Sequence, residues 1–294
     1  MVNKRHVVFS VITDLLTLAP IVGAMAAIEY GKTYQRGYFP NDESLKYPYY
    51  TNTVPSWVLW AINLPVIIAF IILFEIINSY EVGLKRKFMG LPRVITSIYR
   101  YTYTLIIGFC ITVLITSIGK QVIGRLRPHF FDACNPSAIE TTALGYVTSY
   151  NCLNKSQTEY VLKDVKKSFP SGHSSTAMYN ACFLVYYVYL RAPAKRTLAG
   201  LATVLQVTAL SVGIFICLSR ISDNKHHWSD VLIGGLLGVV IAIIVPKFIN
   251  SVYYTLVGLD GSKNISDISH RHQKVPDTDS LINNDGYVYP EDNL

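Results

Sequence analysis

The sequence predicts an all-α membrane protein with six transmembrane helices. Of its 294 residues, 51% are hydrophobic and only 15% are charged, and the mean hydropathy is +0.31. This composition is too apolar for an ordinary soluble domain. The apolar residues are also concentrated in stretches close to the roughly 20 residues that a helix needs to cross a bilayer. These stretches lie at about 7–28, 57–78, 102–119, 177–190, 199–218 and 231–250.

The six stretches are expected to form one membrane domain, residues 1–257. The first follows Lys4, Arg5 and His6, as a signal peptide would, but it is longer than a signal peptide's apolar core and further spans follow it, so we interpret it as a retained span. The fourth is short, and the segment SSTAMYN at its start would extend the helix. The polar residues 258–294 contain too few apolar side chains for a core, which predicts a disordered cytoplasmic tail.

Loop 120–170 indicates the orientation, which the basic residues alone do not decide because they flank the spans on both sides. Asn154 begins an Asn-Lys-Ser glycosylation pattern, usable only on the lumenal or extracellular side. Cys134 and Cys152 share this loop and could pair in an oxidising compartment. Chance occurrence and free thiols are the alternatives. We expect both termini in the cytoplasm and a multi-pass protein of the plasma membrane, with internal membranes of the secretory route as the alternative.

Three polar segments lie where the predicted spans meet the outer side. They are KQVIGRLRP from Lys120, PSGH from Pro170 and SRISDNKHHWSD from Ser219. Lys120 and Arg127 are seven residues apart, so they share a face if the helix continues that far, and Pro128 would then end it. Because the six-span topology places all three segments on one side, they can converge on one site.

The cations and the helix start in these segments predict a phosphate site. Lys120, Arg127 and Arg220 supply positive charge, and the planar fork of arginine matches the oxygens of a phosphate. Ser171 and Gly172 fall where a helix begins, and free backbone N–H groups there favour an anion. Glycine also lets the backbone come close to it.

Two histidines in the same segments predict the chemistry. His226 and Asp230 are four residues apart, which on one helix face matches a nucleophile or base oriented by a carboxylate. His173 is placed to protonate the leaving oxygen as a general acid. The predicted reaction is phosphate monoester hydrolysis through a phosphohistidine, with no metal or other cofactor. A zinc site is the alternative, which the neighbouring cations disfavour.

Four other polar residues are expected to have ordinary roles. His227 should point away from His226 on a helix and contact solvent, and Arg125 should contact headgroups or the surface. Asp14 and Glu75 lie in or near apolar spans, where acids are candidates for function. Their position away from the outer side favours structural hydrogen bonds between helices.

The three segments together resemble the signature of the type 2 phosphatidic acid phosphatase superfamily, K-x6-R-P, P-S-G-H and S-R-x5-H-x3-D, with every position filled. The stretch YQRGYFPNDESLKYPY at 34–49 further resembles the animal lipid phosphate phosphatases, also called phospholipid phosphatases. The resemblance covers about residues 5–255. It implies His226 as nucleophile, Asp230 as its partner and His173 as acid. It also implies five phosphate ligands, namely Lys120, Arg127, Ser171, Gly172 and Arg220. The residues that would shape the motifs are Pro128, Pro170 and Ser219.

The resemblance implies lipid phosphates of the outer leaflet as substrates, namely phosphatidic acid, lysophosphatidic acid, ceramide 1-phosphate and sphingosine 1-phosphate, and thus a role in phospholipid metabolism and lipid signalling. A homo-oligomer is possible, and no nucleic acid partner is expected. Two rival functions are a transporter or scramblase, which should carry repeats and place charges at the middle of the membrane, and a scaffold or lipid receptor without catalysis. The intact signature disfavours the second.

Overall fold

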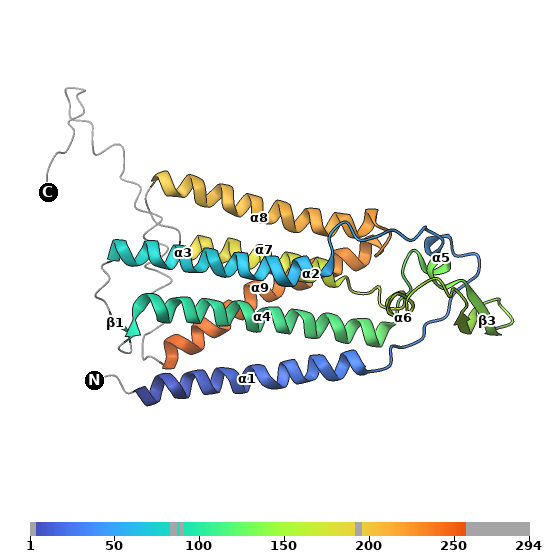
Figure 1. Ribbon diagram of the computed structural model, residues 1–294, viewed down its shortest axis with the longest axis horizontal. Coiled ribbons are helices and arrows are strands. Elements are labelled where there is room, and N and C mark those ends of the chain that lie inside the picture. Colours follow the sequence, from blue (N-terminus) through green and yellow to red (C-terminus); the bar gives the residue numbers. More distant parts are fainter. Residues whose placement is uncertain (1–3, 83–86, 89–90, 192–195, 257–294) are drawn as a thin grey trace, which may run out of the picture. The chain divides into compact units, whose positions relative to one another are not determined.

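The computed structural model describes residues 4–82, 87–88, 91–191 and 196–256 and is mostly helical (Figure 1). The predicted tail, 258–294, lies outside the described residues. The elements in chain order are α1 (Lys4–Tyr30), η1 (Glu43–Leu45), α2 (Ser56–Val58), η2 (Leu59–Asn63), α3 (Leu64–Val82), β1 (Lys87–Phe88), β2 (Leu91–Pro92), α4 (Arg93–Ile123), α5 (Phe130–Cys134), β3 (Pro136–Thr141), β4 (Val147–Cys152), α6 (Glu159–Asp164), α7 (Gly172–Arg191), α8 (Arg196–Ser222) and α9 (Trp228–Leu256).

Within the described part of the chain, five helical segments are long and apolar enough to cross a membrane. They are Val11–Tyr30, Ser56–Ser79, Val94–Ile123, Ala199–Ser222 and Trp228–Ile249. The fourth predicted stretch lies in α7, whose first half is too polar to be counted with them. Because α7 is largely buried and contacts α3, α4 and α8, its Ser, Thr and Asn side chains need not face lipid. The six-span topology stays a prediction.

The helices pack around one apolar core in the bundle. α1, α3, α4, α7 and α8 run lengthwise in Figure 1, and α4 contacts α1, α3 and α7. The buried tyrosines of α7 complete this core with their hydroxyl groups bonded to backbone carbonyls: Tyr179 donates to Leu105 over 2.9 Å and Tyr187 to Ile71 over 3.2 Å. Buried polar groups are thus satisfied inside the apolar bundle.

α9 lies directly on the first turns of α7. A Cβ atom at Gly234 would stand 2.5 Å from the Ser171 carbonyl oxygen, and one at Gly238 would stand 2.2 Å from that of Ser175. Two glycines four residues apart therefore let the backbones approach, as at other close helix crossings in membranes. This contact sets the start of α9 beside the PSGH segment.

A second, smaller core covers one end of the bundle. It contains α5, α6 and the β3–β4 hairpin (Figure 1), and Tyr38 of the first long loop pairs with Val147 of β4. A disulfide joins Cys134 and Cys152. We call this assembly the cap. It holds the long loops over the ends of α4, α7, α8 and α9.

The two intramembrane acids form structural contacts, as predicted. Asp14 accepts a hydrogen bond from the Tyr99 hydroxyl over 2.8 Å, which ties α1 to α4. Glu75 accepts two hydrogen bonds from Arg191, over 2.7 and 2.6 Å, which tie α3 to α7. Neither group belongs to the cluster of polar residues at the cap end of the bundle.

By its contacts the chain divides into Met1–Pro246 and Lys247–Leu294. The bundle and cap described above belong to the first unit. Of the second unit the structure describes Lys247–Leu256, the last part of α9. The predicted boundary after residue 257 stays a prediction.

Candidate active site

The three polar segments meet beneath the cap. The Ser171 N–H donates to the Asp230 carbonyl over 3.0 Å, and the Arg127 side chain donates to the Lys225 carbonyl over 3.1 Å. The Lys120 ammonium lies against Gly172, where a Cβ atom would stand 3.2 Å from it. Contacts between residues up to 98 positions apart along the chain thus form one cluster of polar side chains.

The first segment does not continue as a helix to Pro128, so that part of the prediction is wrong. α4 ends at Ile123, and Gly124 follows in the left-handed conformation with φ at 56°. A Cβ atom at Gly124 would stand 2.0 Å from the Tyr34 carbonyl oxygen, so glycine is needed there on both counts. Arg127 therefore reaches the site from an extended segment, and the Pro128 carbonyl accepts from the Tyr47 N–H.

Arg127 is held from behind by Asp164. Its Nε and Nη2 donate to the Asp164 carbonyl and carboxylate over 2.8 and 2.7 Å. Burial alone would raise the pKa of Asp164, but the positive charges of Arg127 and Lys120, with smaller contributions from nearby histidines, together outweigh burial and lower it, so the carboxylate is ionised. The remaining N–H donors of Arg127 stay available for an anion.

Arg220 is fully buried and fixed in the same manner. Its Nη2 donates to Asp223 over 2.6 Å and its Nη1 to Asn52 over 3.1 Å, while the Ser219 hydroxyl accepts from its Nε over 3.2 Å. Asp223 is itself held by the N–H and hydroxyl of Thr53, over 2.8 and 2.6 Å. The first long loop thus reaches into the site through residues 52–54.

The ring of His226 has a defined tautomer. Its Nδ1 lies 2.7 Å from the Ser168 carbonyl oxygen, which can only accept, so Nδ1 carries the proton and Nε2 keeps its lone pair. Burial, followed by the positive charge of Arg127, lowers the pKa of His226 to about 3. The imidazole is therefore neutral at physiological pH.

Asp230 is not hydrogen-bonded to His226, contrary to the predicted pairing. Its Oδ2 lies 3.9 Å from Nδ1 of His226 and instead accepts from the Ser168 hydroxyl over 2.6 Å and the His227 N–H over 3.0 Å. The second bond caps α9, which begins only at Trp228, so His226 precedes the helix rather than sharing its face. Ser168 therefore contacts both residues, Asp230 through its hydroxyl and His226 through its carbonyl.

Arg125 and His227 both contact this carboxylate, so neither has the surface role predicted for it. Arg125 donates to Asp230 over 2.5 Å and to the Ser229 hydroxyl over 2.8 Å. The Nδ1 atom of His227 lies 3.2 Å from Oδ2 of Asp230. The cause is again the position of Asp230 in the first turn of α9, where its side chain turns back over the residues before the helix.

His173 faces the same cluster from the first turn of α7. It is half-buried, within electrostatic range of Arg220, His226, Lys120 and Arg127. Its Nε2 lies 3.2 Å from the Val54 carbonyl oxygen, so Nε2 carries the proton and points toward the loop at 52–54.

The other predicted residues lie around the start of α7. The buried Ser171 hydroxyl accepts from Ser174 over 2.9 Å, and the N–H groups of Gly172 and His173, in the first helical turn, have no intrahelical acceptor. Pro170 follows a cis peptide bond and packs against α4 at Gly119, where a Cβ atom would stand 2.6 Å from its ring. Ser219 supports Arg220 as described.

The side chains around this cluster carry an excess of positive charge. Five cations (Lys120, Arg125, Arg127, Arg220 and Lys225) face three carboxylates (Asp164, Asp223 and Asp230). A doubly charged phosphate monoester would balance this excess. Among the described residues, no group of three or more His, Cys, Asp or Glu side chains is placed to hold a metal ion.

Sequence reasoning missed several residues of the site. Asp223 follows Arg220 by three residues in a helical pattern, and this spacing is the signal that could have paired them. Ser168 and Asp164 carry no such signal, because their partners are over 30 residues away along the chain. Asn52 and Thr53 lie in a loop that the predicted topology placed on the same side as the three segments without indicating a contact.

Comparisons with known proteins identify the family of the chain. The PAP2 superfamily matches residues 101–253, which include all three segments. Phospholipid phosphatase 1 of Rattus norvegicus is 36% identical over 252 residues, covering 85% of this chain and 86% of the rat protein. Phospholipid phosphatase 2 of Mus musculus is 29% identical over 252 residues, covering 85% of this chain and 89% of the mouse protein. No solved structure matches the chain. The chain is a multi-pass membrane protein that belongs to the PAP2 superfamily and, within it, to the animal lipid phosphate phosphatase family.

Proposed function

We propose that this protein hydrolyses lipid phosphate monoesters with His226 as the nucleophile. The observation that carries the proposal is the His226 ring, whose Nδ1–H is bonded to the Ser168 carbonyl over 2.7 Å. The opposite nitrogen keeps its lone pair in a buried position beside Arg127. A neutral imidazole with a fixed tautomer next to phosphate-binding cations is the arrangement that nucleophilic attack on phosphorus requires.

The reaction has two steps. The negative charge of a bound phosphate would favour the imidazolium form of His173. Nε2 of His226 attacks phosphorus, the P–O bond to the lipid alcohol breaks, and this imidazolium gives its Nε2 proton to the departing oxygen and becomes neutral. Water then attacks the phosphohistidine with His173 as the base, the P–N bond breaks, and inorganic phosphate leaves. Arg127, Arg220 and Lys120 stabilise the charge that spreads over the equatorial oxygens in both transition states.

The contact between His173 and Val54 supports this order of events. The Nε2–H of His173 is satisfied by the Val54 carbonyl over 3.2 Å, a neutral acceptor at the end of the 52–54 loop. The leaving oxygen of a bound substrate would replace that carbonyl as the acceptor. A proton donor is therefore already directed toward the space next to Arg220.

The substrates proposed are phosphatidic acid, lysophosphatidic acid, ceramide 1-phosphate and sphingosine 1-phosphate. Relatives named phospholipid phosphatases support a lipid substrate, and the position of the site at the ends of apolar helices suits a phosphate at headgroup level. Hydrolysis there would serve phospholipid metabolism and lipid signalling.

We further propose that the cap lies outside the cell or in the lumen, with both termini in the cytoplasm and the protein in the plasma membrane. The Asn154 sequon lies at the cap, where its carboxamide oxygen accepts from the Ser156 hydroxyl over 2.6 Å. If Asn154 is glycosylated, glycosidase should increase the gel mobility of the membrane-expressed protein, and Asn154→Gln should remove the shift. Unchanged mobility of the unsubstituted protein would rule out the use of this sequon.

The mechanism requires no metal ion. Purified protein in neutral detergent should release phosphate from lysophosphatidic acid at the same rate with and without EDTA. His226→Ala should lose activity by on the order of 10⁶-fold, the loss expected when a covalent catalyst loses its nucleophile. Equal rates in the two proteins, or loss of activity with EDTA, would refute the mechanism.

A further inference from the structure

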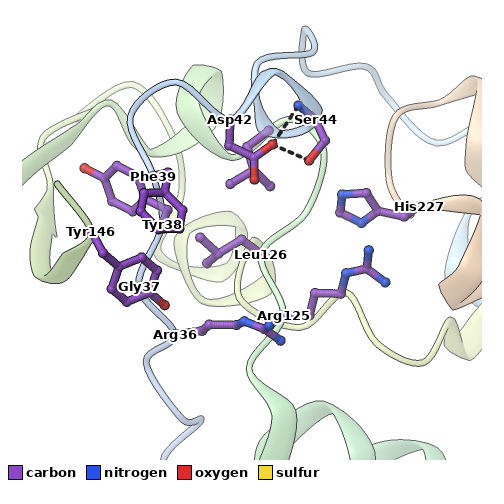
Figure 2. A pocket seen from close by; sticks show the side chains of 11 residues that line it. Arg36, Gly37, Tyr38, Phe39, Asp42, Ser44, Arg125, Leu126, Tyr146 and His227 are labelled. Carbon is purple, nitrogen blue, oxygen red and sulfur yellow. Dashed lines mark hydrogen bonds between the residues drawn. The ribbon is translucent and has the colours of Figure 1, made fainter. Parts of the chain in front are cut away.

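A cavity of about 260 Å³ is lined in part by Arg125 and His227 (Figure 2), both of which contact Asp230. Its walls come from the first long loop and from the segment after α4. Tyr146, which precedes β4, and His227 complete them. None of the described residues assigned above to phosphoryl transfer lines it. The lining of the cavity therefore differs from the proposed catalytic residues, and two of its side chains, Arg125 and His227, contact Asp230.

Arginine side chains, which are positively charged hydrogen-bond donors, outnumber carboxylates in the wall of this cavity. Figure 2 shows Arg36 and Arg125 along one side, His227 next to Arg125, and Asp42 with Ser44 across from them. Arg36 is exposed and, within the part of the chain that the structure describes, has no ion pair. Arg125 uses Nη1 for Asp230 and Ser229, which leaves Nε and Nη2 available.

The one carboxylate in the cavity wall does not balance these donors. Asp42 accepts from the N–H and hydroxyl of Ser44, over 3.0 and 2.7 Å, and thereby caps η1. The rest of the wall includes the rings of Phe39 and Tyr146, packed edge to face with centroids 4.9 Å apart. Two guanidinium groups over a cavity with stiff aromatic walls suit a phosphate group, which arginine binds through paired N–H donors.

We propose that this cavity is a second anion site, which binds a phosphate group between Arg36 and Arg125 beside His227. The volume suits a free phosphate, a small phosphate ester or a lipid headgroup, and excludes acyl chains. The shared chemistry is the phosphate, and the source is a soluble anion or a membrane lipid.

A bound anion would also change catalysis. Arg125 and His227 contact both the cavity and Asp230, and Ser168 contacts both Asp230 and His226. An anion that shares the charge of Arg125 weakens the hold of Arg125 on Asp230. This coupling rests on the proposed function, whereas binding in the cavity does not.

Residue-resolved modification of arginine by phenylglyoxal tests the binding. The full chain carrying His226→Ala in neutral detergent is treated with and without inorganic phosphate. Modification of Arg36 should slow by about tenfold when phosphate is present at about ten times its dissociation constant. Adding Arg220→Gln, which disables the proposed catalytic cradle, should leave this protection in place, and adding Arg36→Gln should remove the protection of Arg125.

Lys32→Gln is the matched control, because Lys32 is an exposed cation in the same loop that does not line the cavity; it should leave the protection of Arg36 unchanged. Nanodiscs of phosphatidylcholine, with and without phosphatidylglycerol and without free phosphate, form the second arm. Protection by inorganic phosphate identifies a soluble anion, and protection only by phosphatidylglycerol identifies a lipid headgroup.

Protection in neither arm would overturn the proposal, as would protection that disappears with Arg220→Gln. Failure of the proposed function has a different signature, since it would leave turnover equal with and without His226→Ala while the footprint at Arg36 persisted.

Discussion

The two histidines of the site are held by different parts of the molecule. His226 is buried in the turn between α8 and α9, and its ring is bonded to a carbonyl in the segment that leads into α7. His173 is half-buried on α7, and its ring is bonded to a carbonyl in the loop at 52–54. The segment between α6 and α7 therefore fixes the group that would form a covalent bond to phosphorus. A loop of the cap side provides the acceptor that a substrate oxygen would displace.

The largest effect should come from comparing the two histidines on different leaving groups. His173→Ala should slow hydrolysis of lysophosphatidic acid by about 10²–10⁴-fold, the usual contribution of a general acid. On p-nitrophenyl phosphate the loss should be much smaller, because nitrophenolate departs without a proton. His226→Ala should abolish both reactions. Phosphate release measured for both substrates with both variants gives the four rates.

An equal loss on the two substrates in His173→Ala would contradict the role of His173 as acid. Residual activity of His226→Ala on p-nitrophenyl phosphate alone would instead assign attack to water.

A smaller effect is expected from Ser168→Ala, which tests how His226 is fixed. The substitution keeps the carbonyl that binds Nδ1 but removes the hydroxyl bonded to Asp230 over 2.6 Å. A hydrogen bond to a charged group contributes about 1.5–3 kcal/mol, so kcat should fall about tenfold or more. Ser222→Ala, which changes an exposed serine at the end of α8, is the control and should not change kcat.

The pH profile separates this role from a general loss of packing. Burial and Arg127 lower the pKa of His226 to about 3, and only the neutral ring can attack. With one donor fewer, the Asp230 carboxylate 3.9 Å away should stabilise the imidazolium more strongly and raise this pKa. The acidic limb of kcat/KM should therefore move to higher pH in Ser168→Ala relative to the unsubstituted protein. An unchanged limb would mean that Ser168 is structural only.

The sequence was sufficient for the parts of the molecule that depend on composition and on local motifs. Apolar stretches predicted helices, and the segments that contain His226, His173 and the three cations were identified before their contacts were known. It was not sufficient for contacts set by tertiary packing. The residue after α4 must be glycine because Tyr34 lies against Gly124, and no local pattern indicates Tyr34.

Asp230 shows the same limit in the active site. Its spacing from His226 matches one helix face, but α9 begins two residues after His226, at Trp228. The carboxylate then caps the helix and binds Arg125 and Ser168. Spacing alone predicts which residues would share a helix face. It does not locate the start of the helix to within one turn.

The smallest effect should come from loosening the loop that holds His173. Thr53 donates through its hydroxyl to Asp223 over 2.6 Å, and Asp223 in turn holds Arg220. Thr53→Val removes this bond at nearly constant volume, and a loss of about 1 kcal/mol would reduce kcat/KM about fivefold. Thr53→Ser keeps the hydroxyl and should retain most of the activity.

Because the loop supports the acid and not the nucleophile, the loss in Thr53→Val should be smaller on p-nitrophenyl phosphate than on lysophosphatidic acid. Equal losses on the two substrates would place the effect on Arg220 and the phosphate cradle. The division between a nucleophile held by the segment before α7 and an acid held by the loop at 52–54 would then not stand.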